Sequence, residues 1–313
     1  MSRGQIAALF PGQGAQYPGM GKDFAEAFAV ARETFQEADD LIQESLSKII
    51  FEGPEADLTK TKNSQLAIFV VSAAIFRSVQ SQFPEVKPAV CAGLSLGEYT
   101  ALWASGKLGF QETLRLIRHR ANFMNEACET TPGTMAAVLG LDGPSVEKAL
   151  QGMSGIWVAN YNCPGQIVIS GLETAVQEAA LALKSAGAKR VIPLQVHGAF
   201  HSGLMQKAQD KLAPFIEKAP LIESDVALAM NAPGNFVSTL AEIRTQLVRQ
   251  VTASVRWEQL ILNMGKEESY HFFEMGCGKT LSSFNKKMGL STLSVEKVAD
   301  LELIAREMEV CAR

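Results

Sequence analysis

The sequence predicts an α/β protein in which helices cover a parallel sheet and a smaller domain is inserted into the larger one. Over most of the chain, short apolar segments of strand length alternate with longer segments of helical periodicity, which is typical of βαβ units. Between Thr134 and Val196 the order changes to βαββαβ, that of a ferredoxin-like split unit. We therefore expect a large domain over 1–130 and 200–313 and a ferredoxin-like small subdomain over 131–199.

The first part of the large domain begins with an apolar run of strand length, Gln5 to Phe10. Phe24, Phe28, Ala31 and Phe35 then recur at spacings of four, three and four, which predicts one amphipathic helix. The other elements expected here are a helical stretch ending at Gly53-Pro54, a mostly buried helix over Leu66–Phe83, a short strand over Ala89–Ala92 and a long helix over Phe110–Cys128.

The inserted part and the remainder of the large domain follow in order. In the insert we expect strands at Met135–Leu141, Ile156–Asn160, Gln166–Ser170 and Arg190–Val196, with helices at Ser145–Leu150 and Glu173–Ala186. The large domain resumes with strands at Val226–Met230 and His271–Met275, helices at Thr239–Val251 and Lys279–Lys287, and a last strand and helix near Leu301–Val310.

The composition excludes several classes of protein. The chain has 313 residues, of which 47% are hydrophobic and 20% charged, which is typical of a globular protein. A net charge of -4 without a basic run gives no reason to expect nucleic acid. Five scattered cysteines favour a reducing compartment, and the longest apolar run, Leu66–Phe76, is too short to span a bilayer. We expect a cytoplasmic protein with no membrane partner.

The sharpest local signal is Gly93-Leu94-Ser95-Leu96-Gly97, a G-x-S-x-G pattern. An apolar strand precedes it, and the helix-compatible segment Glu98–Ala104 follows it. In this context the pattern is typical of a nucleophile elbow, a tight strand-to-helix turn that holds the serine hydroxyl clear of the backbone. Glycines flank the serine because larger side chains would clash in the turn. Ser95 is the predicted covalent nucleophile, and the alternative is a chance loop of small residues.

A serine nucleophile needs a base, and the chain has only four histidines. His119 lies between two arginines in a predicted helix, which favours a solvated position, and His271 begins a strand. His197 and His201 lie in the loop after Val196, and such loops often carry catalytic residues. One of these two is the predicted base, and spacing leaves the choice open. Their i,i+4 spacing also resembles a zinc pair, but the glutamate of H-E-x-x-H is missing, so no metal is expected.

Two further features concern ligand binding. The loop Phe10-Pro-Gly-Gln-Gly-Ala-Gln16 has two glycines that let its backbone approach a ligand, and its N–H groups could complete an oxyanion hole. A dinucleotide fingerprint is excluded, because G-x-G-x-x-G would need glycine at Tyr17. Arg120 could grip a carboxylate through two hydrogen bonds, but most arginines are solvated, as we expect for Arg115 and Arg118. Periodicity leaves both alternatives open for Arg120.

Together these motifs resemble the malonyl-CoA:acyl carrier protein transacylase family of type II fatty acid synthesis. The matching motifs occur in the family's order and span nearly the whole chain, which makes the set far more specific than G-x-S-x-G alone. They are Phe10–Gln16, Gly93–Tyr99, Arg120 with Phe123-Met124, Asn160-Tyr-Asn162 before Pro164-Gly165-Gln166, Gly198-Ala-Phe-His201, Gln250 and Glu274-Met-Gly276.

The resemblance implies an α/β-hydrolase-like core with a parallel sheet, which carries the ferredoxin-like small subdomain as an insert. It implies that the base is His201 and that the backbone carbonyl of Gln250 orients the imidazole. The oxyanion hole is then formed by the N–H groups of Gln13 and Leu96. The resemblance also implies that Ser95 is the nucleophile of the enzyme.

The resemblance also implies the substrate contacts. Arg120 is expected to pair with the free carboxylate of the malonyl group, and Asn162 is expected to bind substrate. Phe200 would leave little room for an additional methyl group, which favours malonyl over methylmalonyl by about 1–3 kcal/mol. Leu94 stands where many members have histidine, which removes one polar neighbour from the site.

The implied activity is ping-pong acyl transfer from malonyl-CoA to acyl carrier protein by a monomer, with no metal and no cofactor. Three alternatives remain. The same serine and histidine would serve a hydrolase or thioesterase that uses water as acceptor. A non-catalytic binding module would keep the fold, and an acyltransferase for another extender unit or for a polyketide carrier would differ only in its substrates.

Overall fold

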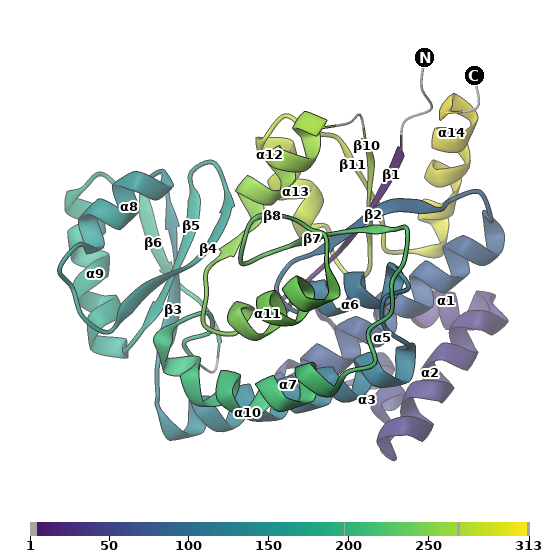
Figure 1. The fold of residues 1–313 in the computed structure, drawn as a ribbon, viewed down its shortest axis with the longest axis horizontal. Helices are drawn as coiled ribbons and strands as arrows, with labels where there is room; N and C mark the ends of the chain where they lie inside the picture. The colour runs from purple at the N-terminus through teal and green to yellow at the C-terminus, as the bar shows by residue number, and fades with distance from the viewer. Residues whose placement is uncertain (1–4, 197, 268–269, 312–313) are drawn as a thin grey trace.

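A computed structural model of the protein describes residues 5–196, 198–267 and 270–311. The strands of these residues form one sheet of six strands and a second of five. Figure 1 shows the second sheet, with helices α8 and α9, at the left of the molecule and the first sheet toward the right, with α7 and α10 running along the bottom. The chain is therefore an α/β protein with two sheets, as the alternation of segments predicted.

The first sheet places the site, because most of its strands are parallel and end at the same edge. Its order is β11-β10-β1-β2-β7-β8, and only β8 runs antiparallel to its neighbour. The carboxyl ends of β1, β2 and β7 therefore lie together. The bounds are β1 (Gln5–Phe10), β2 (Pro88–Gly93), β7 (Ala227–Met230), β8 (Asn235–Val237), β10 (Tyr270–Met275) and β11 (Thr292–Val295).

Helices from both halves of the chain lie around the first sheet (Figure 1). They are α1 (Lys22–Ala27), α2 (Ala29–Ile42), α3 (Leu46–Glu52), α4 (Glu55–Thr59), α5 (Thr61–Gln82), α6 (Gly97–Ala104), α7 (Phe110–Thr130), α10 (Gln206–Lys218), α11 (Leu240–Gln250), α12 (Trp257–Glu267), α13 (Thr280–Lys287) and α14 (Leu301–Cys311). The sequence did not predict α4, α10 or α12.

The single helix expected over Phe24–Phe35 is wrong, because the chain breaks into α1 and α2 at Phe28. The backbone of Phe28 is extended, with φ −124° and ψ 130°. Both short helices pack against α5, so apolar side chains recur at helical spacing on either side of the break. Periodicity alone therefore could not detect the break.

Helix α5 is the centre of the larger hydrophobic core. It is the one helix in the described part of the chain that is long and apolar enough to cross a membrane. However, 83% of its most apolar window is buried inside the protein. Such burial is typical of a core helix, as expected for Leu66–Phe83.

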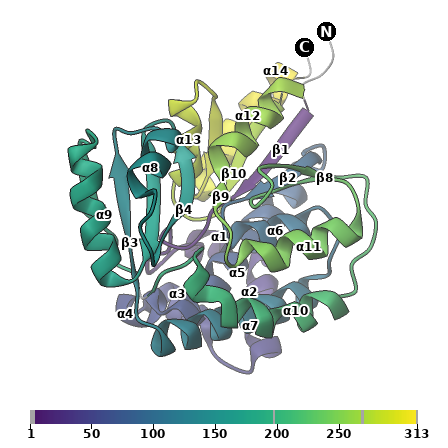
Figure 2. The same cartoon turned by 60° about the vertical axis from the view of Figure 1, so that its left-hand side comes forward.

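The second sheet has the order β6-β3-β5-β4-β9 and is antiparallel except where β9 joins β4. Its chain order before β9 is βαββαβ, and α8 and α9 lie on the side facing away from the first sheet (Figure 1 and Figure 2). The strand expected over Arg190–Val196 ends earlier, at Pro193, because the chain turns so that Val196 N bonds to Leu194 O at 3.0 Å. The bounds are β3 (Thr134–Leu139), α8 (Gly143–Leu150), β4 (Ile156–Cys163), β5 (Gln166–Gly171), α9 (Glu173–Ser185), β6 (Arg190–Pro193) and β9 (Val255–Arg256).

Candidate active site

Ser95 stands in a tight turn between β2 and α6. Its φ of 52° places a non-glycine residue in the left-handed region, which costs about 1–3 kcal/mol and persists only where the surroundings hold it. A Cβ on Gly93 would lie 2.1 Å from the carbonyl group of Gly97, and a Cβ on Gly97 would lie 2.1 Å from Phe10 O. Only glycine fits at either position. The structure thus confirms the steric reason for the G-x-S-x-G pattern.

The side chains of Ser95 and His201 meet although 106 positions separate them. The distance from Ser95 Oγ to His201 Nε2 is 2.7 Å, and His201 Nδ1 lies 2.9 Å from the backbone oxygen of Gln250 at the end of α11. Because a carbonyl oxygen only accepts, Nδ1 carries the ring proton and Nε2 accepts from the serine hydroxyl. The three groups have the geometry of a nucleophile, a base and an orienting group.

The imidazole of His201 is held in its neutral form. Burial, followed by the charge of Arg120, lowers the pKa of His201 to about 4, although the hydrogen bond to Gln250 opposes the shift. The residue is 4% exposed. An imidazole that is neutral at pH 7 is ready to accept a proton.

Arg120 is buried, not solvated, with 1% of its surface exposed. It donates to Gln65 Oε1 at 2.6 Å, to Ser95 Oγ at 3.1 Å and to Gln250 Oε1 at 3.1 Å, all uncharged acceptors. Burial raises the pKa of nearby Glu98 to about 8, so that carboxyl is mostly protonated at pH 7. A buried cation without an anionic partner is costly, and the site is therefore prepared for an anionic ligand.

A cavity of about 790 Å³ opens over these groups and is lined by residues from both sheets. Ser95, Arg120 and His201 reach it from the first sheet and its helices, while Met135 and Val168 line it from the second. Cavities of roughly 300–1,000 Å³ are typical of small-molecule sites. The volume suits a ligand that is larger than the acyl group alone.

The loop after β1 packs directly against the elbow. A Cβ on Gly12 would lie 2.4 Å from Leu94 O, so the loop backbone and the elbow are in contact. Gln13 follows in the loop and lines the cavity together with Ser95. Leu96 is buried at the N-terminus of α6, where the helix dipole is positive. The loop, the elbow and the helix terminus thus meet at one point.

Asn162 and Phe200 lie in the cavity wall, as does Leu94. Both Asn162 and Phe200 are 6% exposed. Asn162 Oδ1 is buried and has no hydrogen-bond partner among the residues that the structure describes. A buried acceptor without a donor is costly, so a ligand N–H group would stabilise it.

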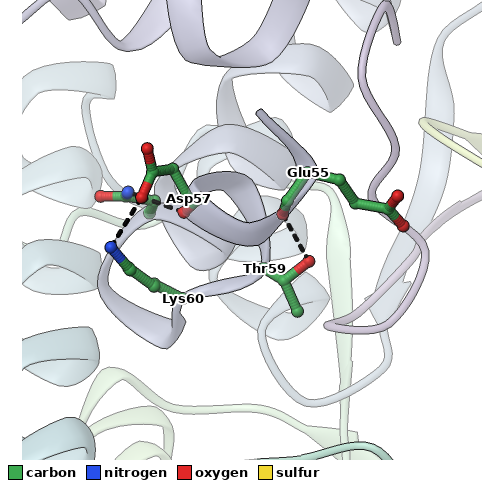
Figure 3. Close-up of polar contacts among 5 residues, drawn as sticks. Glu55, Asp57, Thr59 and Lys60 are labelled. Atoms are coloured by element: carbon green, nitrogen blue, oxygen red, sulfur yellow. Dashed lines mark hydrogen bonds and ion pairs between the residues drawn. The ribbon is translucent and has the colours of Figure 1, made fainter. Parts of the chain in front are cut away.

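The short helix α4 and the residues after it form another part of the cavity wall, including Ala56, Thr59 and Lys60. Figure 3 shows two contacts that hold this segment: Lys60 Nζ lies 2.6 Å from Asp57 Oδ1, and Thr59 Oγ1 donates to Glu55 O at 2.8 Å. The ion pair is half-exposed, so it contributes only about 0–1 kcal/mol.

Of the other candidate histidines and arginines, those that the structure describes do not line the cavity around Ser95. His197 lies outside the described residues. His119 is half-buried, not solvated, because the Phe215 ring stacks on it with centroids 3.8 Å apart. His271 Nδ1 lies 2.7 Å from Glu307 Oε1. Of the expected surface arginines, Arg115 and Arg118 have side chains 59% and 44% exposed, which confirms both predictions.

Sequence reasoning missed three buried polar residues that touch this site: Gln65, Glu98 and Asn231. Gln65 is a polar side chain within a nearly apolar helix, which was an available signal. Asn231 follows a strand in an ordinary loop and carries no such signal. For metal ions, no three His, Cys, Asp or Glu side chains gather closely enough anywhere in the described ranges.

This geometry is typical of enzymes that act through an activated serine, and comparisons with known proteins specify the family. The acyl transferase domain family matches residues 8–273. A malonyl CoA-acyl carrier protein transacylase of Bacillus subtilis is 39% identical over 311 residues, covering 97% of this chain and 98% of the relative. The chain belongs to the malonyl CoA-acyl carrier protein transacylases, and it is an acyltransferase.

Solved structures agree with this assignment. The crystal structure of an acyl-carrier-protein S-malonyltransferase from Bartonella henselae is similar with a TM-score of 0.92 and 37% identity, covering 99% of this chain and 100% of that one. A malonyl-transacylase in complex with a type II PKS acyl-carrier protein is similar with a TM-score of 0.89 and 36% identity, covering 95% and 97% of the two chains.

Proposed function

We propose that this chain transfers a malonyl group from malonyl-CoA to the phosphopantetheine thiol of acyl carrier protein, supplying fatty acid synthesis. The observation that carries the proposal is the buried guanidinium of Arg120, which lies 3.1 Å from Ser95 Oγ and has only neutral acceptors. A malonyl thioester presents a carboxylate close to its reacting carbonyl. The names of the relatives and the complex of one related enzyme with a carrier protein support the same substrates.

The proposed reaction is ping-pong. His201 removes the Ser95 proton as Oγ attacks the thioester carbonyl, and the oxyanion binds the N–H groups of Gln13 and Leu96, each contributing about 3–4 kcal/mol. The C–S bond breaks, coenzyme A leaves with the proton from His201, and malonyl-Ser95 remains. The carrier thiol then attacks this ester, with His201 again taking the proton and returning it to Ser95. The carbonyl of Gln250 orients the imidazole throughout.

The remaining contacts select the substrate. Arg120 pairs with the malonyl carboxylate and holds it away from the ester, so the intermediate persists until a thiol arrives. Phe200 occupies the space that a methyl branch would need. Asn162 Oδ1 accepts a hydrogen bond from an amide of the pantetheine arm, which supplies the donor that this buried atom lacks in the described structure.

The proposal includes the organisation of the molecule. We assign 1–130 and 200–313 to an α/β-hydrolase-like catalytic subdomain and 131–199 to a ferredoxin-like subdomain, which the order of elements and strands supports. Strand β9 lies outside the second range and pairs with β4, so the subdomains share a sheet. The enzyme is proposed to act as a cytoplasmic monomer that requires no metal and no redox cofactor.

Brief exposure to malonyl-CoA followed by intact mass measurement tests the proposal. Wild-type protein should gain one malonyl group and release one coenzyme A, and Ser95→Ala should gain none. Addition of the holo carrier protein should then remove the adduct and yield malonyl-carrier. Steady release of coenzyme A without carrier would favour a hydrolase, no adduct on wild type would favour a binding module, and preferential labelling by another acyl-CoA would change the substrate.

A further inference from the structure

Asn231 is fully buried directly after β7, and each of its polar groups is hydrogen-bonded. Its side chain accepts from Ser95 N at 2.6 Å and donates from Nδ2 to Gly93 O at 2.7 Å. Its backbone N–H donates to Glu98 Oε2 at 2.5 Å, and its carbonyl accepts from Arg256 N at 3.0 Å. Three of these four partners lie within or next to the nucleophile elbow, and the fourth lies in β9.

The sheet explains how one side chain reaches both sides of the turn. Strands β2 and β7 are parallel, with Ala92 opposite Ala229, so the residue after β7 lies beside the residues after β2. The Asn231 amide therefore bridges the carbonyl of Gly93 and the N–H of Ser95. Its two bonds hold the backbone on either side of Leu94, where Ser95 adopts its left-handed conformation.

Glu98 ties the helix side of the elbow to the same residue. The carboxyl is fully buried in α6, and its Oε2 accepts from Asn231 N. Its Oε1 has no hydrogen-bond partner in the part of the chain that the structure describes. A buried carboxyl with an unpaired oxygen destabilises the fold. The hydrogen bond from Asn231 N indicates what is gained in return, which is a defined position for the asparagine.

We propose that Asn231 is a positioning residue that holds the elbow in its reactive conformation, and that Glu98 in turn holds Asn231. The proposal rests on the proposed role of Ser95 as nucleophile. Without the Asn231 amide, the Ser95 backbone is free to leave the left-handed region, which moves Oγ away from His201 Nε2 and turns the N–H of Leu96. The contact between Arg120 and Gln65 lies on other elements and remains, so substrate binding is retained while acylation slows.

Asn231→Ala tests this inference, with Asn285→Ala as the matched control. Asn285 is equally buried, and its side chain also bonds two partners, Trp257 Nε1 and Thr292 Oγ1. Single-turnover malonylation of Ser95, followed by mass, should be about 100-fold slower in Asn231→Ala, because displacement of a reacting group by about 1 Å costs roughly that factor. KM for malonyl-CoA should stay close to the wild-type value. Asn285→Ala should lose thermal stability but, while folded, keep its malonylation rate.

A second pair of variants keeps the test decisive if Asn231→Ala does not fold. Glu98→Gln retains an oxygen that accepts from Asn231 N and should keep the wild-type rate, whereas Glu98→Ala should lose malonylation. Equal rates for Glu98→Gln and Glu98→Ala, a raised KM with unchanged kcat in Asn231→Ala, or an equal loss of rate in Asn285→Ala would overturn the proposal.

Reaction of Ser95 with a sulfonyl fluoride separates this inference from the proposed function, because the reagent reports nucleophile geometry without the substrate. Wild type that reacts with the reagent but not with malonyl-CoA would contradict the proposed function alone. In that case, a sulfonylation rate in Asn231→Ala equal to that of wild type would overturn the positioning role, and a slower rate would support it.

Discussion

Replacing Arg120 by alanine should separate malonyl from acetyl transfer. Arg120 is 1% exposed, and its Nε is buried without a hydrogen-bond partner among the described residues. Its NH2 group lies 3.1 Å from Oγ of Ser95, the proposed nucleophile. Nε would donate to one oxygen of a carboxylate arriving at Ser95, and NH2 would donate to the other in place of its contact with Ser95 Oγ. An acetyl group has no carboxylate and does not use these two donors.

The size of the effect follows from these two contacts. A hydrogen bond to a charged group contributes about 1.5–3 kcal/mol, so the loss of two costs about 3–6 kcal/mol. Since 1.4 kcal/mol corresponds to a factor of ten, the ratio of kcat/KM for malonyl-CoA to that for acetyl-CoA should fall by about 10²–10⁴ in Arg120→Ala. The assay is formation of malonyl- and acetyl-carrier protein from each acyl-CoA, measured separately.

Arg118→Ala is the control for this prediction, because Arg118 lies on the same helix and its half-exposed side chain bonds Ile42 O and Glu44. It should leave the ratio unchanged. An equal loss of malonyl and acetyl transfer in Arg120→Ala would refute the carboxylate contact and would point instead to a general role beside Ser95.

Two further predictions concern pH. Because the pKa of His201 is lowered to about 4, kcat/KM for acylation should stay level between pH 5 and 7, and a fall centred near the usual histidine pKa of 6.5 would contradict the neutral base. Burial raises the pKa of Glu98 from 4.5 to about 8, so the folded protein keeps a proton that the unfolded chain releases. The free energy of unfolding should therefore fall as pH rises from 4.5 to 8. Urea unfolding of Glu98→Gln should show a weaker fall. An identical pH dependence of the unfolding free energy in variant and wild type would disprove the role of Glu98 in this fall.

The elements that the sequence predicted well have local causes. The elbow needs glycines at 93 and 97 because the turn leaves no room for a Cβ, and that requirement is visible as a five-residue pattern. Helices α5 and α7 are long enough for their apolar positions to define them. The break at Phe28 was not predictable from spacing, because both short helices bury side chains against the same neighbour.

The site was predictable only in part. The residues alone left the base open between His197 and His201, and the motif resemblance selected His201, which the structure places 2.7 Å from Ser95. Periodicity did not show that Arg120 is buried, because the face that a helix buries depends on the elements packed against it. Asn231 was not found, since its partners in the elbow, Gly93, Ser95 and Glu98, lie more than 130 positions away in the chain.

The sequence by itself determined the chemistry that local geometry encodes: a serine between obligatory glycines, preceded by a strand and followed by a helix. The tertiary structure decided which distant groups meet that serine. Parallel pairing of β7 with β2 brings Asn231 to the elbow, and the end of α11 brings the Gln250 carbonyl to His201. Such contacts depend on strand order and helix packing, which short-range patterns of side chains do not specify.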